Sequence, residues 1–399
     1  MTSFVQSRKF LVAAFLLAMT FCNLTLLFRV LPALRNGYQD FTIYYTGARL
    51  LRNGQASALY NLGTQYRTQL TFTHVPIRQG PLPYNHPPFE TLLFVPFTLL
   101  KYWPAYLVWT ALNLIMLAAS VVLLRRQFPQ LAAVPPIVLG LGATAFFPVA
   151  IGLIQGQDVI LLLFLFVLAI ICLERGNDAV AGALLAAGLF RPHLVVPLVV
   201  LLAIRRWRIL LGFVPVALLL VGISVAIMGW SVPFDYVRFV LRVERTGAGG
   251  FGPHAVPNLR GLIADLPGLS FSGPVTAVLV LASSVVVFFL ALRRIRNGRD
   301  SILFASGLAA VTTILVSFHA LSYDLTLLLP TALCLLSRLA GVEGKKIDAR
   351  TILLVVLLFL TPLYIFLLLA VDRFFWFSLI LLWLYLRLML TPAPAEVPA

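Results

Sequence analysis

The segment FLVAAFLLAMTFCNLTLLFRV, residues 10–30, is apolar along most of its length and follows the basic pair Arg8-Lys9. About 20 apolar residues are needed to cross roughly 30 Å of hydrocarbon as a helix. Similar runs recur along the 399-residue chain, which is 61% hydrophobic and only 11% charged, whereas a soluble domain usually carries about 25% charged residues. The sequence therefore predicts an all-α polytopic integral membrane protein and excludes a soluble enzyme.

The distribution of charge predicts the topology. The net charge is +16, but the basic residues gather in short tracts between apolar runs, as the positive-inside rule expects, so no nucleic-acid partner is predicted. Placing these tracts and both termini in the cytoplasm gives about 12 crossings, with about 10 to 13 as the range. The first apolar segment lacks a clear small-residue cleavage site, so we expect an uncleaved anchor. We expect a bacterial plasma-membrane protein.

The apolar runs also define the expected domain organisation. We expect a single transmembrane domain over residues 1–390, with outer loops at about 31–88 and 231–270 and a disordered tail at 391–399. The segment 87–100 is too short to cross alone and is predicted to be re-entrant or interfacial. Because Cys22, Cys172 and Cys334 all lie inside apolar runs, neither a disulfide framework nor a zinc site is expected.

The first outer loop contains NGYQDFTIYYTGARLL, residues 36–51, in which Asp40 opens a helical pattern. One side of this helix is an apolar stripe, and the far side is polar. The stripe contains Phe41, Tyr44, Tyr45, Ala48 and Leu51, and the far side contains Thr42, Thr46, Arg49 and Arg52. The pattern predicts a helix on the membrane surface with Asp40 at its N-terminus. Aspartate is favoured as a helix N-cap, and the local pattern alone favours that role over a catalytic one.

Further polar residues fall at the ends of predicted spans on the outer side, which suggests a shared pocket. They are His86, Gln157, Asp158, His193, His254, Arg260, His319 and Asp324. For any one histidine, an interfacial or hydrogen-bonded role is the simpler explanation. Arg191 interrupts an apolar stretch, so it either reaches the interface or pairs with an anion such as a lipid phosphate. No nucleotide-binding motif is present, which favours a lipid-linked substrate over a nucleotide sugar.

Six segments, in order, resemble glycosyltransferase family 87 of the glycosyltransferase-C superfamily. They are DFTIYYTGARLLRNGQASALYN (40–61), YNHPPFETLLFVPFTLL (84–100), WTALNL (109–114), IGLIQGQDVILLLF (151–164), LAAGLFRPHLVVPLVVLLAIRRWR (185–208) and SFHALSYDLTLLLP (317–330). The resemblance covers roughly residues 5–340. It implies a glycosyltransferase-C-like fold with amphipathic helices in the first outer loop. It also implies inverting transfer of mannose, or a related sugar, from a polyprenyl-phosphate carrier to a lipid or glycan acceptor on the non-cytoplasmic face.

The resemblance also implies roles for single residues. Asp40 matches the general base, which fits an inverting reaction because the anionic phosphate leaves without much need for an acid. Arg191 matches the basic position expected to stabilise that phosphate, and His319 a position that contacts phosphate or acceptor. The remaining candidates for donor or acceptor binding are His193, Tyr44, Tyr45, His86, Gln157, Asp158, Asp324 and Arg260.

The sequence departs from the family pattern in ways that leave some roles open. Asp40 has no acidic neighbour, whereas many superfamily members carry a second acid there, so metal dependence is doubtful and no cofactor is expected. Arg191, in the predicted hinge between two short helices, stands where lysine is more often expected, and Asp158 stands where asparagine is common. The main alternative function is a transporter or flippase for polyprenyl phosphates, which would use the same basic pocket without covalent chemistry.

Overall fold

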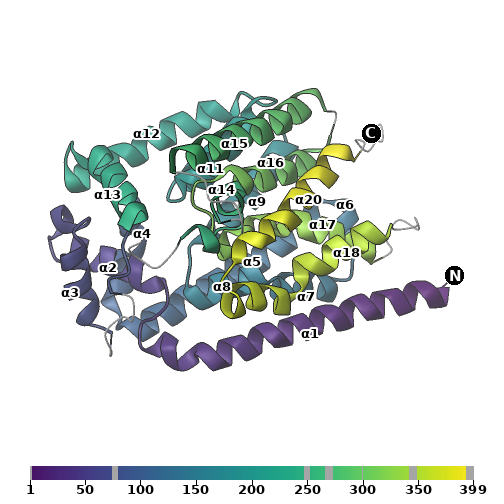
Figure 1. Ribbon diagram of the computed structural model, residues 1–399, viewed down its shortest axis with the longest axis horizontal. Helices are drawn as coiled ribbons and strands as arrows, with labels where there is room; N and C mark the ends of the chain where they lie inside the picture. Colours follow the sequence, from purple (N-terminus) through teal and green to yellow (C-terminus); the bar gives the residue numbers. More distant parts are fainter. Residues whose placement is uncertain are drawn as a thin grey trace.

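The computed structural model describes residues 2–73, 80–246, 252–265, 273–298, 300–340 and 348–391, so the predicted disordered tail lies outside it apart from Thr391. Within these ranges the regular elements are all helical, as predicted. Helix α1 (Thr2–Arg35) runs along one side of a helical bundle, and its start lies at the same end of the bundle as the end of α20 (Ser378–Leu390) (Figure 1). The opposite end holds α2 (Phe41–Arg52), α3 (Leu62–Leu70), α4 (Glu90–Phe94) and α13 (Val232–Thr246).

Four helices of the described chain are long and apolar enough to cross a membrane. They are α1 over Lys9–Arg35, α5 (Tyr102–Gln127), α12 (Ile209–Met228) and α15 (Gly273–Asn297). Counting two bent pairs as single spans raises the number to six, and further apolar helices have only 10–17 residues. Among these shorter helices are α9 (Val159–Glu174), α10 (Asp178–Ala187), α11 (Pro192–Ala203) and α16 (Ile302–Val316). Helix length thus supports a membrane protein, while the twelve crossings and the glycosyltransferase-C fold stay predictions.

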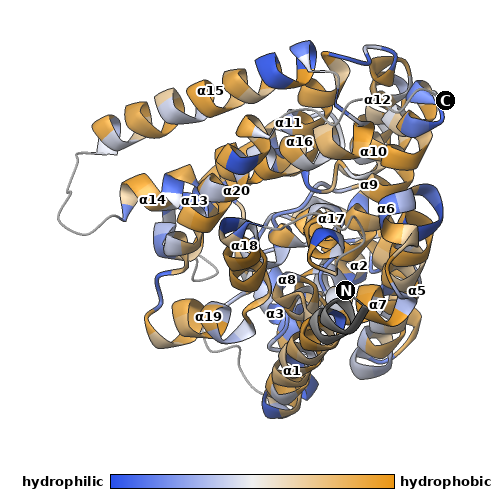
Figure 2. Cartoon of the chain, turned by 90° about the vertical axis from the view of Figure 1, so that its right-hand side faces the viewer, coloured by the Kyte–Doolittle hydropathy of each residue, from blue (hydrophilic) through white to orange (hydrophobic). Residues whose placement is uncertain are grey.

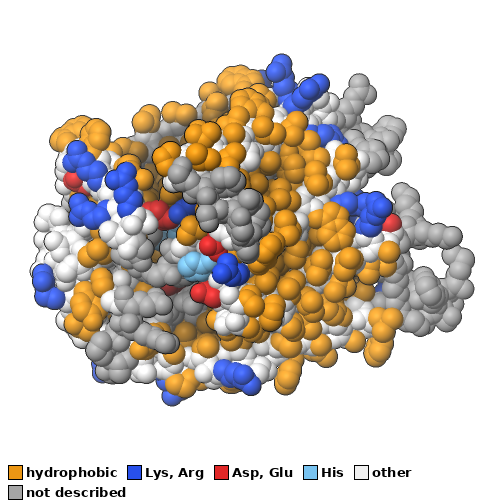
Figure 3. All heavy atoms as spheres, viewed as in Figure 1, with side chains coloured by type: hydrophobic (Ala, Val, Ile, Leu, Met, Phe, Trp, Pro, Cys, Tyr) orange, Lys and Arg blue, Asp and Glu red, His pale blue; other side chains and the backbone are white. Residues whose placement is uncertain are grey.

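The surface of the bundle is apolar where lipid would contact it. Hydrophobic side chains cover the broad middle of the molecule, with groups of Lys and Arg toward its ends (Figure 3). The outer helix α15 is hydrophobic along most of its length (Figure 2), and large side chains such as Leu218 of α12 and Phe289 of α15 are 66% and 60% exposed. An apolar surface of this extent is expected against hydrocarbon rather than water.

The two bent pairs both contact Asn23 of α1. Helix α7 (Pro136–Ala145) meets α8 (Phe147–Gln155) at 61°, and α18 (Ala349–Phe359) meets α19 (Thr361–Ile365) and its continuation at 57°. Pro148 lacks an N–H and its ring clashes with the carbonyl four residues earlier, so α7 breaks before it. The freed Thr144 and Ala145 carbonyls accept hydrogen bonds from Asn23 Nδ2, and the Thr361 hydroxyl donates to Asn23 Oδ1. One buried amide therefore joins α1 to both bends.

Small residues bring α10 and α12 close together. A Cβ atom on Gly182 would lie 1.8 Å from the Ile209 carbonyl oxygen, and one on Gly212 would lie 1.8 Å from the Ala179 carbonyl oxygen. Helices in membranes associate through such small-residue contacts because lipid provides no hydrophobic driving force. The close approach fixes α10, and with it the start of α11.

Helix α2 is buried along most of its length, which corrects the prediction that Thr42 and Thr46 lie on its exposed polar side. Thr42 and Thr46 are both 0% exposed. The Thr42 hydroxyl donates to the Gly37 carbonyl and contacts the Tyr102 hydroxyl at 2.6 Å, and the Thr46 hydroxyl donates to the Thr42 carbonyl. The threonines satisfy their polar groups locally, so their polarity did not indicate exposure. Arg49 and Arg52 are the residues of the predicted polar face that reach the surface.

Candidate active site

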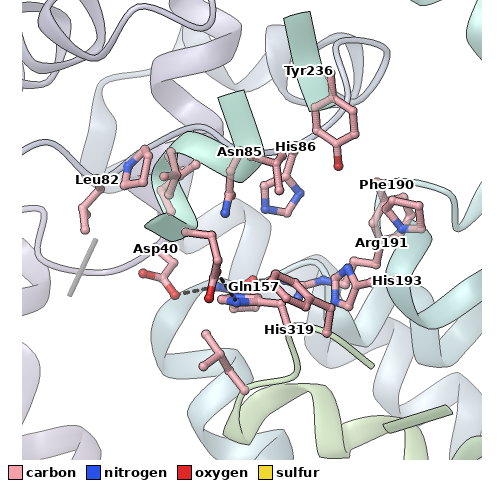
Figure 4. Close-up of a pocket in the computed structure, with 18 of the residues that line it drawn as sticks. Asp40, Leu82, Asn85, His86, Gln157, Phe190, Arg191, His193, Tyr236 and His319 are labelled. Carbon is pink, nitrogen blue, oxygen red and sulfur yellow. Dashed lines mark hydrogen bonds and ion pairs between the residues drawn. The ribbon is translucent and has the colours of Figure 1, made fainter. Parts of the chain in front are cut away.

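A cavity of about 210 Å³ lies where α2, α13 and the ends of several bundle helices meet. Its polar lining includes Asp40, His86, Gln157, Arg191, His193 and His319, which Figure 4 shows around one space. These residues come from the start of α2, the loop before α4, the α8–α9 turn, the α10–α11 hinge and the segment after α16. The structure therefore brings together six of the residues that the sequence singled out.

Asp40 is held as a hydrogen-bond acceptor rather than as a helix cap. Its carboxylate makes no capping hydrogen bond to α2 and instead accepts one from Gln157 Nε2 at 2.5 Å. Its backbone N–H donates to Gln155 Oε1 at 3.1 Å. Burial raises the pKa of Asp40 to about 6, against a partly offsetting contribution from the Gln157 hydrogen bond. The capping explanation is wrong, and a buried carboxylate with a raised pKa lines the cavity.

Gln157 links Asp40 to a buried arginine. Gly156 ends α8 in the left-handed region with φ of 62°, and a Cβ there would lie 2.9 Å from the Phe41 Cβ, so glycine permits the sharp turn. The turn aims the Gln157 amide into the cavity. Its Nε2 donates to Asp40, while its Oε1 accepts from Tyr44 Oη at 2.5 Å and from Arg191 Nη2.

Arg191 lies in the gap between α10 and α11 because the residue before a proline is disfavoured in a helix. Only 3% of it is exposed. Its Nε donates to Asp158 Oδ1 and its Nη1 to Asp324 Oδ1, both at 2.6 Å, and its Nη2 lies 3.4 Å from Tyr44 Oη. Two buried carboxylates thus face this one positive charge. Arg191 therefore has two protein acids as partners and also contacts Gln157 and Tyr44, while its predicted role in phosphate binding stays a prediction.

A second charged group forms the side of the cavity nearest α13. Glu244 of α13 pairs with Arg260 Nη2 of α14 (Leu259–Ala264) and with His319 Nδ1 at 3.5 Å. Arg260 also lies over the Phe318 ring at 4.2 Å. Although burial raises it, the pKa of Glu244 is lowered overall because His319 and Arg260 favour its charged form. An arginine and a histidine therefore converge on one carboxylate at the cavity wall.

Behind Arg191, three side chains form the group of described residues that could hold a metal ion. His86 Nδ1 lies 2.8 Å from Glu90 Oε2 and 3.7 Å from Asp158 Oδ2. Burial lowers the pKa of His86 to about 4, so its imidazole is neutral near pH 7. The buried carboxyl groups of Glu90, Asp158 and Asp324 outnumber the one buried guanidinium, that of Arg191. Bound protons or a cation must therefore supply the missing positive charge.

The other predicted residues lie around this cavity or away from it. Tyr44, Asp158 and Asp324 hold Arg191 without lining the cavity, and Arg260 reaches it through Glu244. Tyr45 points elsewhere, because its hydroxyl donates to the Leu100 carbonyl at 2.9 Å and its ring lines a separate groove. His254 lies 3.9 Å from Asp372 and is also outside the cavity.

The sequence interpretation missed the contribution of α13. Four residues of this helix line the cavity, at positions 236, 240, 243 and 244. They are Tyr236, Val240, Val243 and Glu244. Their spacing of i, i+4, i+7 and i+8 is the signature of one helical face, so the signal was present in the second outer loop. Tyr323 was missed as well, and it lies under the Arg191 guanidinium at 5.2 Å.

The fold and the site define an apolar helical membrane protein with a polar, carboxylate-containing pocket at one end of its bundle. A model of glycosyltransferase family 87 matches residues 84–317, which is more than half of the chain. The chain belongs to this family and is a glycosyltransferase. No curated protein and no solved structure matches it. The matched range contains His86, Gln157 and Arg191, whereas Asp40 and His319 lie outside it.

Proposed function

We propose that this chain is an inverting glycosyltransferase that moves mannose, or a related sugar, from a polyprenyl-phosphate carrier to a lipid or glycan acceptor on the non-cytoplasmic face. The observation that carries the proposal is the Asp40–Gln157–Arg191 chain of hydrogen bonds along one cavity. These hydrogen bonds fix the direction of the Asp40 carboxylate and link it through Gln157 to the Arg191 guanidinium. Family membership supports glycosyl transfer, and the nature of the donor rests on the sequence resemblance.

In this reaction Asp40 accepts the proton of the acceptor hydroxyl. The hydroxyl oxygen forms a bond to the sugar C1 as the bond from C1 to the phosphate oxygen breaks. The electron pair of the broken bond stays on the phosphate oxygen, and polyprenyl phosphate leaves. A pKa of about 6 leaves Asp40 mostly ionised near pH 7 and makes it a stronger base than an ordinary aspartate. Gln157 supports this role by donating to the charged form of the carboxylate.

The donor phosphate is proposed to bind Arg260 and His319. These two side chains approach the same carboxylate, Glu244, so a phosphate that replaced it would find two hydrogen-bonding groups already in place. The Arg191 guanidinium is committed to Asp158 and Asp324, which makes it the weaker candidate. In this proposal Arg191 positions Gln157 and Tyr44 rather than neutralising the leaving group.

The location of the cavity supports a reaction at one membrane surface. Helices α2 and α13, which line it, lie at the end of the bundle opposite the start of α1 and the end of α20 (Figure 1). If the termini are cytoplasmic, as the charge distribution predicts, the cavity opens on the non-cytoplasmic side. A lipid-linked donor could then enter from the bilayer without crossing it.

The proposal is tested by incubating the purified full-length protein in detergent with radiolabelled polyprenyl-phosphate mannose and a membrane glycolipid extract. We expect the label to appear in a glycolipid product and polyprenyl phosphate to be released in equal amount. A flippase breaks no covalent bond, and in detergent there is no membrane to transport across, so a flippase would leave the donor intact. Donor binding without any bond cleavage would overturn the proposed function in favour of transport.

A further inference from the structure

A groove of about 660 Å³ lies beside α2 and shares no lining residue with the candidate active site. It is formed by the end of α1, one face of α2, the residues after α3 and the start of α5. Ile43 of α2 faces the active-site cavity, whereas Tyr45 faces the groove. Two positions turn a helix by about 200°, so the cavity and the groove lie on opposite sides of α2.

The lining of the groove is basic. It contains Arg35, Arg49, Arg52 and Lys101 and no acidic residue. Within the described parts of the chain, none of these four side chains forms an ion pair with an acid. Cations that lack an acidic partner repel each other, so such a cluster is stable in the presence of an anion.

Two of the arginines are held in place by aromatic rings. The Arg35 guanidinium lies 5.8 Å from the Trp103 ring centre, and that of Arg49 lies 5.7 Å from Phe72 and 6.0 Å from Tyr45. Arg49 also donates one hydrogen bond, to Thr71 Oγ1 at 3.2 Å. A guanidinium has five N–H donors, so most of them stay available. Stacked arginines with free donors are well suited to bind a phosphate.

The surroundings of the groove indicate that this phosphate is carried by a lipid. Two spans, α1 and α5, end at the groove. Leu99 and Leu100 are 73% and 41% exposed at its edge, next to the ring of Trp103. Tryptophan and tyrosine are enriched where membrane proteins meet the headgroup layer. A soluble anion would make no use of these exposed leucines, whereas acyl chains would cover them.

We propose that the groove is a binding site for the phosphate headgroup of an anionic membrane phospholipid, with Arg35, Arg49, Arg52 and Lys101 as its ligands. The lipid acts on the α2 face opposite Asp40 and holds this helix against the start of α5. The proposal concerns lipid binding alone and stands whether or not the protein transfers mannose.

The test uses the full-length protein in a neutral detergent and fluorescently labelled phosphatidylglycerol, displaced by unlabelled phosphatidylglycerol, phosphatidylcholine or inorganic phosphate. The variants are Arg49→Gln and Lys101→Gln, and Arg67→Gln on α3 is the matched control because this exposed arginine lies outside the groove. Lys101→Gln tests the site even if the Arg49 variant folds poorly, since no hydrogen bond of the Lys101 side chain is found among the described residues.

We expect phosphatidylglycerol to bind wild-type protein at least about tenfold more tightly than phosphatidylcholine, and each groove variant to bind roughly tenfold more weakly, the loss of one charge-assisted hydrogen bond. Arg67→Gln should bind as the wild type does. Equal affinity for the two lipids would overturn the proposal. So would an equal loss in Arg67→Gln, which would indicate general surface charge. Displacement by inorganic phosphate as effectively as by the lipid would show a soluble-anion site instead.

Discussion

Replacing Gln157 with leucine tests how the structure prepares Asp40. The substitution removes the amide that donates to the Asp40 carboxylate at 2.5 Å. This hydrogen bond favours the charged form of Asp40 and so lowers its pKa, whereas burial raises it. Without the hydrogen bond, the pKa should rise above its value of about 6. A base is active when it is deprotonated. The acidic limb of the pH–rate profile should therefore move to higher pH.

The size of this shift follows from the hydrogen bond. A hydrogen bond to a charged group contributes about 1.5–3 kcal/mol, and 1.36 kcal/mol changes a pKa by one. Gln157→Leu should thus raise the pKa of Asp40 by roughly 1 to 2. For a rise of about 1.5, the ionised fraction at pH 7 falls from about nine-tenths to about a quarter, so the rate falls about fourfold. Near pH 9 that loss should largely disappear.

The assay is kcat/KM for sugar transfer between pH 5 and pH 9.5, with Gln155→Leu as the matched control. Gln155 accepts a hydrogen bond from the Asp40 backbone and does not touch its carboxylate, so its loss should leave the limb in place. His86 cannot produce the limb, because its pKa is lowered to about 4 by burial. An unmoved limb in Gln157→Leu, or an equal movement in Gln155→Leu, would refute the reasoning.

Three further predictions concern stability and donor binding. Arg191→Met leaves Asp158 and Asp324 without their cation and should lower the free energy of unfolding by about 3–5 kcal/mol. The thermal unfolding midpoint in detergent should fall accordingly, and an unchanged midpoint contradicts the buried pairing. Gly182→Ala should prevent α10 from packing on α12 and reduce the yield of folded protein, whereas Gly140→Ala, which has open space around it, should not; equal yields contradict the packing. Glu244→Gln should lower the KM for donor by up to about fivefold, as expected for loss of a half-buried pair worth about 1 kcal/mol, and a raised KM contradicts the placement of the phosphate.

The sequence predicted the helical elements well because apolar runs and prolines define them. The apolar run from Trp103 to Leu124 lies within α5, and the hinge at Arg191 separates α10 from α11 as expected. The number of crossings was harder to predict, because an apolar run gives no measure of how a helix bends. Pro148 and Pro362 divide two runs into bent pairs, and the carbonyls freed near Pro148 are satisfied by Asn23, more than 100 residues away in the chain.

The site was predictable in its members but not in its connections. Polar residues at span ends indicated a pocket, and Asp40, Arg191 and His319 do line one cavity. What each side chain contacts depends on three-dimensional neighbours that no local pattern encodes. Arg191 donates to Asp158 and Asp324, which lie 33 and 133 positions away in the chain, so the local pattern did not indicate these partners. The same limit applies to Thr42 and Thr46, whose polarity suggested exposure although both are buried.

The most direct test of the account is a comparison of Asp40→Asn with the wild type, measuring both donor affinity and kcat for transfer from polyprenyl-phosphate mannose. Asparagine keeps the size and hydrogen-bonding capacity of the side chain but cannot take a proton at neutral pH. We expect donor affinity to be retained and kcat to fall by about 10²–10⁴, the usual contribution of a general base. Transfer by Asp40→Asn at the wild-type rate would contradict the assignment of Asp40 as the catalytic base.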